Sequence, residues 1–156
     1  MSEPNQPEVV EVEPVTVAVI HGEVAMAEMR DFFDRSFTLL AEVVGTDGAA
    51  ITGAAFALYH RPLTESADLT VGFPTDRPVS PRDGVEVGEL PGGRVARVVH
   101  AGGFDGLGAA WEGLVAWAEA RGHTLGPDFW EVYLTEPSPD MDPADLRTQL
   151  NWTIAD

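Results

Sequence analysis

The sequence contains no cysteine. This absence excludes disulfide bonds, thiolate metal ligands and cysteine nucleophiles, and it is compatible with a reducing compartment. Basic residues are also scarce, because nine Lys and Arg residues are outnumbered by 26 Asp and Glu residues, which gives a net charge of −17. A field of this sign repels phosphate backbones, so we expect no direct binding to DNA or RNA.

Long apolar runs are absent as well. No run approaches the ~18 residues that a membrane helix needs, and residues 1–14 (MSEPNQPEVVEVEP) lack the basic and apolar segments of a secretory signal. We therefore predict a cytoplasmic protein without a membrane partner. The 156 residues, of which 44% are hydrophobic, predict one globular domain over residues 9–156, preceded by a flexible leader over residues 1–8.

Hydrophobic periodicity predicts the elements of the first half of the chain. Apolar residues at spacings of three and four from Met26 to Val44 are typical of an amphipathic helix, and Gly45 follows the last of them. Alternating or β-branched segments predict strands on either side of this helix. The expected strands are 9–13, 15–21 (ended by Gly22), 54–60 and 68–73.

After a proline-rich linker over residues 75–84, the same order of elements starts again. We expect a hairpin of strands 85–90 and 95–100 around the turn Pro91-Gly92-Gly93, a helix over 105–121, and strands over 129–135 and 147–154. The predicted fold is α+β, with two tandem β-α-β-β modules over residues 9–74 and 85–156. An antiparallel sheet with helices, pseudo-two-fold symmetry and a central ligand groove would result.

The strand after each helix carries the clearest sign of an internal repeat. Placing residues 55–59 (AFALY) on residues 129–133 (FWEVY) pairs Phe56 with Trp130, Tyr59 with Tyr133, and Ala57 with Glu131. The second module therefore has an acid where the first has a small apolar residue.

Glu131 is the main candidate for a ligand anchor. Side chains alternate along a strand, so Phe129, Glu131 and Tyr133 share one face. Apolar surroundings disfavour a charged carboxylate, and an organic cation between aromatic faces would compensate for that cost. The alternative is that Glu131 lies on a solvated sheet face or pairs with an arginine.

Other aromatic side chains are candidates for the lining of a groove. Trp111, Trp152 and Phe33 are the candidates on the remaining elements, with Trp111 and Trp152 preferred. Core packing is the alternative for each of them, because aromatic grooves and aromatic cores look alike in sequence.

The four histidines do not form a metal-binding motif. His21, His60, His100 and His123 are widely dispersed, and the match of His21 with His100 across the repeat favours a shared structural turn. We predict no metal site and no cofactor, haem included.

Five stretches of the sequence resemble GyrI-like small-molecule-binding domains. They are VAVIHG, GAAFALYHR and DLTVGFP in the first half, and ELPGGRVARVVHAGGFDGLGAAWEGLVAWAEARG and FWEVYLTEP in the second. These domains serve as effector-binding domains of AraC-type and MerR-type regulators. The resemblance implies tandem modules around a ligand groove, with Glu131 contacting lipophilic cations and Tyr133 and Tyr59 lining the groove. The chain departs from the family at Ala101, where many members have glycine, and in having no helix-turn-helix segment.

Three functions follow from these observations and the resemblance. The first is a stand-alone protein that senses or sequesters a hydrophobic or cationic aromatic ligand, with a regulator as its protein partner if it controls transcription. The second is a hydrolase of electrophilic small molecules, in which Glu131 is the general base and a neighbouring tyrosine the acid. The third is an inhibitor-like protein that contacts DNA gyrase. The natural ligand, and whether the protein is a monomer or a dimer, stay open.

Overall fold

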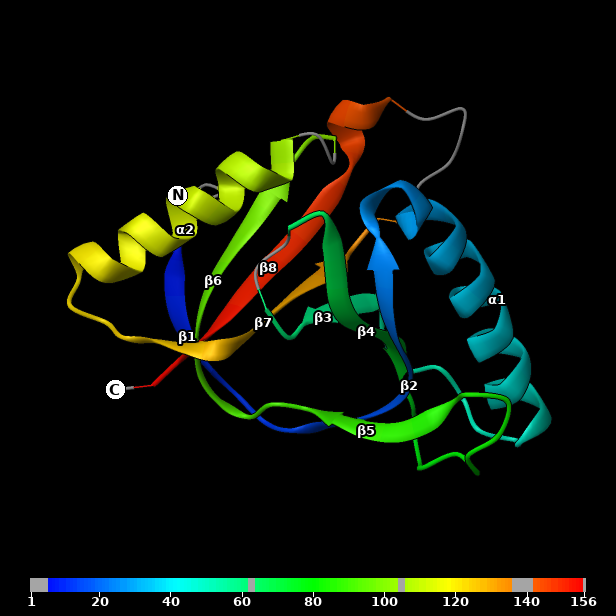
Figure 1. Cartoon of the computed structure of the whole chain (residues 1–156). Coiled ribbons are helices and arrows are strands. Elements are labelled where there is room, and N and C mark those ends of the chain that lie inside the picture. Colours follow the sequence, from blue (N-terminus) through cyan, green and yellow to red (C-terminus); the bar gives the residue numbers. More distant parts are fainter. Residues whose placement is uncertain (1–5, 62–63, 104–105, 136–141, 156) are drawn as a thin grey trace. The chain divides into compact units, whose positions relative to one another are not determined.

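The computed structural model describes residues 6–61, 64–103, 106–135 and 142–155 (Figure 1). Its two helices and its antiparallel strands confirm the expected α+β class. The chain divides into two compact units, residues 13–92 and residues 93–156, and the second also includes residues 1–12. We call them the 13–92 unit and the 93–156 unit.

The described residues of the 13–92 unit form four strands and one long helix. Its antiparallel strands lie in the order β3-β4-β2-β5, and α1 packs against β2 and β4. The elements are β2 (Val15–Ala25), the 3-10 turn η1 (Met26–Glu28), α1 (Met29–Thr46), β3 (Phe56–Tyr59), β4 (Ser66–Pro74) and β5 (Glu86–Leu90).

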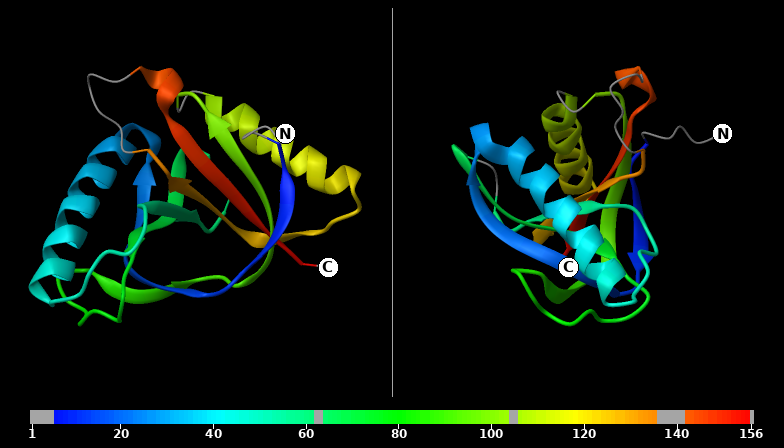
Figure 2. Two further views of the ribbon diagram at one scale, coloured as in Figure 1. Left: turned by 180° about the vertical axis from the view of Figure 1, so that it is seen from behind. Right: turned by 90° about the vertical axis from the view of Figure 1, so that its right-hand side faces the viewer.

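The 93–156 unit repeats this plan with different strands. Its antiparallel strands lie in the order β1-β6-β8-β7, and α2 packs against β6 and β7. The elements are β1 (Glu8–Val12), β6 (Gly93–Ala101), α2 (Leu107–Ala120), β7 (Leu125–Tyr133), the 3-10 turn η3 (Pro143–Asp145) and β8 (Arg147–Ile154). Figure 2 shows from two further sides that each helix lies along the strands of its own unit.

The helix predicted from Met26 is shorter at its start, because Met26–Glu28 form a 3-10 turn and α1 begins at Met29. The residues that α1 buries are Phe32, Ser36, Leu40, Val43 and Val44, whereas Phe33 and Phe37 are only half-buried. Packing against β2 and β4 selects this face of a helix that has apolar residues on a wide arc.

Gly22 does not end its strand, contrary to the prediction. β2 continues to Ala25, and Gly22 pairs with Leu69 in the ladder with β4. A Cβ atom at Gly22 would lie 2.5 Å from Cε1 of Phe32, so the missing side chain makes room for α1 rather than for a turn.

The expected hairpin of residues 85–100 is also wrong. β5 pairs with β2, with Leu90 opposite Val15, whereas β6 pairs with β1, with Val95 opposite Val10, and with β8. A Cβ atom at Gly92 would lie 2.5 Å from the Pro14 side chain, so the chain at Gly92 runs beside Pro14 instead of folding back. The strand β1, predicted as part of the first module, therefore belongs to the 93–156 unit, and β5, predicted as part of the second module, belongs to the 13–92 unit.

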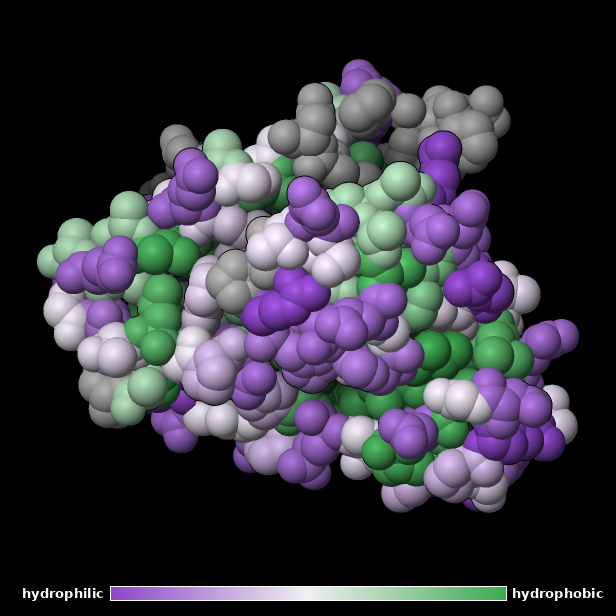
Figure 3. Space-filling view, viewed as in Figure 1, coloured by the Kyte–Doolittle hydropathy of each residue, from purple (hydrophilic) through white to green (hydrophobic). Residues whose placement is uncertain are grey.

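Residues 1–5, most of the expected leader, lie outside the described residues, as do residues 104–105 at the expected start of the second helix. Hydrophilic residues cover much of the side drawn in Figure 3, with hydrophobic residues in smaller patches. Within the described ranges, neither helix combines the length and the apolar character that crossing a membrane requires.

Candidate functional site

Glu131 lies in β7 and is 5% exposed. Two neutral donors approach its carboxylate: the Nε1–H of Trp111 donates to Oε2 at 3.0 Å, and the hydroxyl of Tyr133 donates to Oε1 at 2.9 Å. Burial of a carboxylate is costly unless donors compensate for the lost water. Hydrogen bonds to a charged group contribute about 1.5–3 kcal/mol each, so these two contacts offset a large part of that cost. The solvated-face alternative for Glu131 does not hold.

Strand alternation and ladder register together place Glu131 in this position. Glu131 pairs with Leu150 of β8, and Tyr133, two residues on, pairs with Thr148. Leu150 belongs to the core on which α2 packs, so the same sheet face brings the carboxylate toward that helix. Trp111, in the second turn of α2, reaches it from there.

Three aromatic rings form a cluster beside the carboxylate, which we call the aromatic cluster: Trp111, Phe129 and Trp152. Phe129 stacks on Trp152, with centroids 4.3 Å apart and planes at 20°, and Trp111 meets both rings edge-on at 5.2 and 5.6 Å. The Nε1–H of Trp152 donates to the carbonyl oxygen of Gly126 at 2.7 Å, which holds that indole in place. The result is a rigid aromatic wall with electron-rich faces.

An open pocket of about 340 Å³ adjoins the aromatic cluster. It is lined by Trp111, Glu112, Val115, Ala116, Glu119 and Trp152. Glu112 and Glu119 are exposed, so the pocket has two indoles in its wall and two carboxylates at its surface. Pockets that hold small organic ligands have volumes of roughly 300–1,000 Å³, and this open pocket lies at the lower end of that range.

Sequence reasoning placed six residues in the ligand site, and four of them lie together in the 93–156 unit: Glu131, Tyr133, Trp111 and Trp152. The other two belong to the 13–92 unit. Tyr59 is buried in β3 opposite Leu69, and Phe33 on α1 is half-buried, with its ring 6.0 Å from that of Phe37.

Phe129 was not among the expected site residues. Its position two residues before Glu131 carried the signal, because strand alternation puts both side chains on one face. The contact from Trp111 to Glu131 had no such signal, since it joins a helix to a strand 20 residues away.

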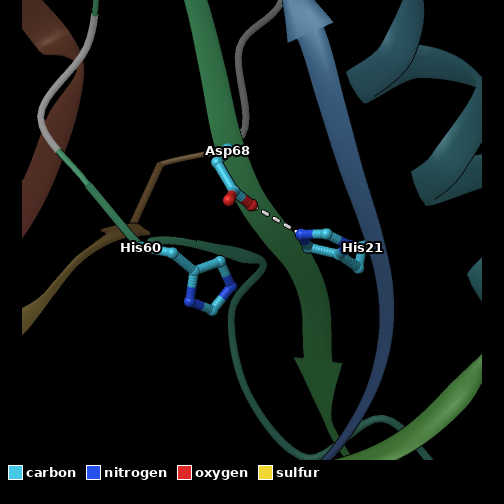
Figure 4. A group of neighbouring side chains, drawn as sticks. All are labelled: His21, His60 and Asp68. Carbon is cyan, nitrogen blue, oxygen red and sulfur yellow. Dashed lines mark hydrogen bonds and ion pairs between the residues drawn. The ribbon is translucent and has the colours of Figure 1, made fainter.

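A second group of polar side chains lies in the 13–92 unit (Figure 4). One donor atom from each of His21, His60 and Asp68 lies within 4.8 Å of the others. His21 Nε2 donates to Asp68 Oδ1 at 2.6 Å, and this hydrogen bond lowers the pKa of the Asp68 carboxyl below its usual value. His21 thus lies within β2 and not in the turn expected from its match with His100.

Comparison with known proteins identifies the fold. A search of curated proteins finds no match. The crystal structure of the EcmrR C-terminal domain is similar, with a TM-score of 0.85 and 19% identity over 97% of this chain and 98% of that one. In the cryo-EM structure of an EcmrR–DNA complex, the match has the same TM-score and 20% identity over 97% of this chain, and this chain spans 57% of the EcmrR chain.

A third solved structure, that of SAV2435 bound to tetraphenylphosphonium, has a TM-score of 0.64 and 10% identity over 96% of this chain and 94% of that one. At these identities the structural likenesses establish the fold alone. The family model of the GyrI-like small molecule binding domain matches residues 5–153, nearly the whole sequence. The chain belongs to the GyrI-like small-molecule-binding domain family.

Proposed function

We propose that the protein binds amphipathic aromatic compounds, preferentially cationic ones, and that it senses or sequesters them. The observation that carries the proposal is the buried Glu131 carboxylate, which is held by Trp111 and Tyr133 beside the aromatic cluster. A fixed negative charge next to aromatic faces is the arrangement that recognises a delocalised organic cation.

Trp111 links the carboxylate to the open pocket. Its Nε1–H donates to Glu131, whereas its ring lines the pocket together with Trp152. A hydrogen bond to a carboxylate increases the electron density of the indole ring, which strengthens its attraction for a cation over its face. The exposed Glu112 and Glu119 and the net charge of −17 add a field that concentrates cations near this surface.

The experiment compares two probes of the same shape and opposite charge. Tetraphenylphosphonium, the ligand in the SAV2435 structure, is titrated against the tryptophan fluorescence of the protein, and tetraphenylborate is titrated in parallel. We expect binding of the cation and little binding of the anion. Glu131→Gln removes the charge, and we expect a loss of cation affinity of about 10- to 100-fold, the equivalent of one charge-assisted interaction.

Glu112→Gln is the matched control, because it removes one negative charge from the exposed lining of the pocket that Trp111 and Trp152 also line. Its effect on cation affinity should stay within a few-fold, since solvent screens an exposed charge. Equal losses in the two variants would mean that the field of the whole protein, and not Glu131, selects the cation. An unchanged affinity in Glu131→Gln would refute the proposed anchor.

The hydrolase alternative uses the same pair of residues. Tyr133 donates to Glu131 at 2.9 Å, which is hydrogen-bonding reach for a general acid–base pair. Turnover of electrophilic esters or epoxides that is lost in both Glu131→Gln and Tyr133→Phe would favour this alternative over plain binding.

A further inference from the structure

We propose that His21, His60 and Asp68 form a binding site for a divalent transition-metal ion of the zinc type, with one or more coordination positions open to solvent or to a small ligand. The site belongs to the 13–92 unit and uses none of the residues of the proposed ligand site.

Strand register brings the three residues together. His21 of β2 lies opposite Thr70 of β4, and the backbone N–H of His60 donates to the carbonyl oxygen of Asp68 at 3.0 Å, which sets His60 opposite Asp68. Asp68 and Thr70 are two residues apart on β4 and therefore share a face. The neighbouring Leu69 is fully buried, so the polar side chains lie on the face opposite to the one that packs into the core.

The geometry is close to that of a coordination sphere. The donor atoms of the three residues lie within 4.8 Å of one another, and His21 Nε2 is 2.6 Å from Asp68 Oδ1 (Figure 4). In a tetrahedral site, metal–nitrogen and metal–oxygen bonds of about 2.0–2.2 Å place the donor atoms roughly 3.3–3.6 Å apart, a separation that lies between these two distances. Rotation about side-chain bonds is enough to open the His21–Asp68 contact around an ion.

The neighbours of the cluster support the orientation of its ligands. Thr70 Oγ1 lies 2.7 Å from His60 Nε2, and the rings of His21 and His60 meet edge-on with centroids 5.5 Å apart. A hydrogen-bonded partner that holds an imidazole in position is the usual outer shell of a metal-binding histidine. Arg61, a nearby cation, donates to Ser66 Oγ at 2.9 Å and lies 3.8 Å from the Glu23 carboxylate.

Donor chemistry and exposure select the class of ion. Two imidazoles and one carboxylate suit Zn²⁺, Co²⁺, Ni²⁺ or Fe²⁺, whereas Ca²⁺ and Mg²⁺ prefer sites made of oxygen alone. The side chain of His21 is 53% exposed and that of Asp68 is 29% exposed, so an ion can enter without unfolding the sheet.

The test uses tag-free protein treated with a chelator and then dialysed. Zn²⁺ is titrated by calorimetry, and Co²⁺ is titrated by visible absorption, since the d–d bands of Co²⁺ report imidazole ligation and coordination number. We expect one equivalent of metal per chain and a rise in the melting temperature on binding. Thr70→Val removes an outer-shell partner, a change that typically weakens metal binding by about 10- to 100-fold, and His21→Ala, His60→Ala and Asp68→Asn should each weaken it further.

Matched controls separate this site from general attraction of cations to an acidic protein. His123→Ala and Asp34→Asn remove the same kinds of side chain elsewhere, and both should bind Zn²⁺ as the unmodified protein does. Circular dichroism and thermal melts establish that each variant is folded. His21→Gln replaces His21→Ala if the alanine variant does not fold. The proposal is overturned if the protein binds no stoichiometric Zn²⁺, or if the three cluster variants bind it as tightly as the controls.

Discussion

The strands that follow the two helices, β7 and β3, have the same pattern of large side chains and differ at one buried position. Each ends on a tyrosine and buries a large aromatic residue, Trp130 in β7 and Phe56 in β3. Between these residues β7 carries Glu131, whereas β3 carries Ala57, which is fully buried. One framework thus supports a buried acid in one unit and a plain apolar core in the other.

The comparison shows what a buried acid requires of its surroundings. Glu131 has the indole of Trp111 and the hydroxyl of Tyr133 as donors, and its ladder partner is Leu150. Ala57 lies opposite Val71, which is also fully buried. The strand pattern alone therefore does not create the site, because the helix must supply a donor as well.

The largest expected effect comes from copying the acid into the other unit. Ala57→Glu would put a carboxylate in a fully buried position, so we expect a loss of at least about 3 kcal/mol in the free energy of unfolding. Urea denaturation measures it. Ala41→Glu, at an exposed position on α1 of the same unit, should change stability by less than about 0.5 kcal/mol. If the Ala57→Glu protein is as stable as the unmodified protein, the surroundings of residue 57 also supply buried hydrogen-bond donors for a carboxylate.

The next effect concerns Tyr133, the tyrosine at the end of β7. Tyr133→Phe removes a donor from the Glu131 carboxylate, and we expect a loss of about 1.5–3 kcal/mol in stability. The same substitution in a Glu131→Gln background should cost less, since the charged acceptor is then absent. The same denaturation experiment measures both variants, and equal losses would contradict a special role for the Tyr133–Glu131 contact.

A change to the close packing of α1 on its sheet should lower stability by as much as Tyr133→Phe does, or by less. Gly22→Ala would place a Cβ atom 2.5 Å from the Phe32 ring, so we expect a loss of roughly 1–3 kcal/mol as α1 shifts from β2. The thermal melting temperature should fall accordingly. Gly22→Ala combined with Phe32→Leu should recover part of the loss if the clash with the ring is the cause.

The smallest effect is a stabilisation. Gly45 of α1 and Gly113 of α2 have nothing within 4 Å of a built Cβ atom, so Gly45→Ala and Gly113→Ala should each stabilise by roughly 0.5–1 kcal/mol. If both units unfold in one transition, both variants move the midpoint of the same urea curve. Two separate transitions, each moved by one variant, would show that the units are independent in stability.

Local sequence patterns account for much of the fold. The periodicity of residues 26–44 predicts α1 to within three residues of its observed start, and alternation along residues 129–133 places Phe129, Glu131 and Tyr133 on one face. These features depend on residues that are neighbours in the chain, so they can be recognised without knowledge of the rest of the structure.

Strand partners could not be predicted in the same way. The turn at Pro91-Gly92-Gly93 is a good hairpin signal, yet β5 pairs with β2 and β6 pairs with β1 and β8. A turn residue reports only what the local backbone can adopt. Which strands then pair depends on which other strands of the chain still have unpaired backbone N–H and C=O groups along an edge.

By itself, the sequence determined the α+β class, the two helices, the resemblance to GyrI-like domains and the face of β7 that carries Glu131. Only the tertiary structure decided that Trp111 reaches Glu131, and that His21, His60 and Asp68 meet on one sheet face. The physical reason is register: His21 and Asp68 are 47 residues apart, and only the antiparallel pairing of β2 with β4 sets their side chains 2.6 Å from each other.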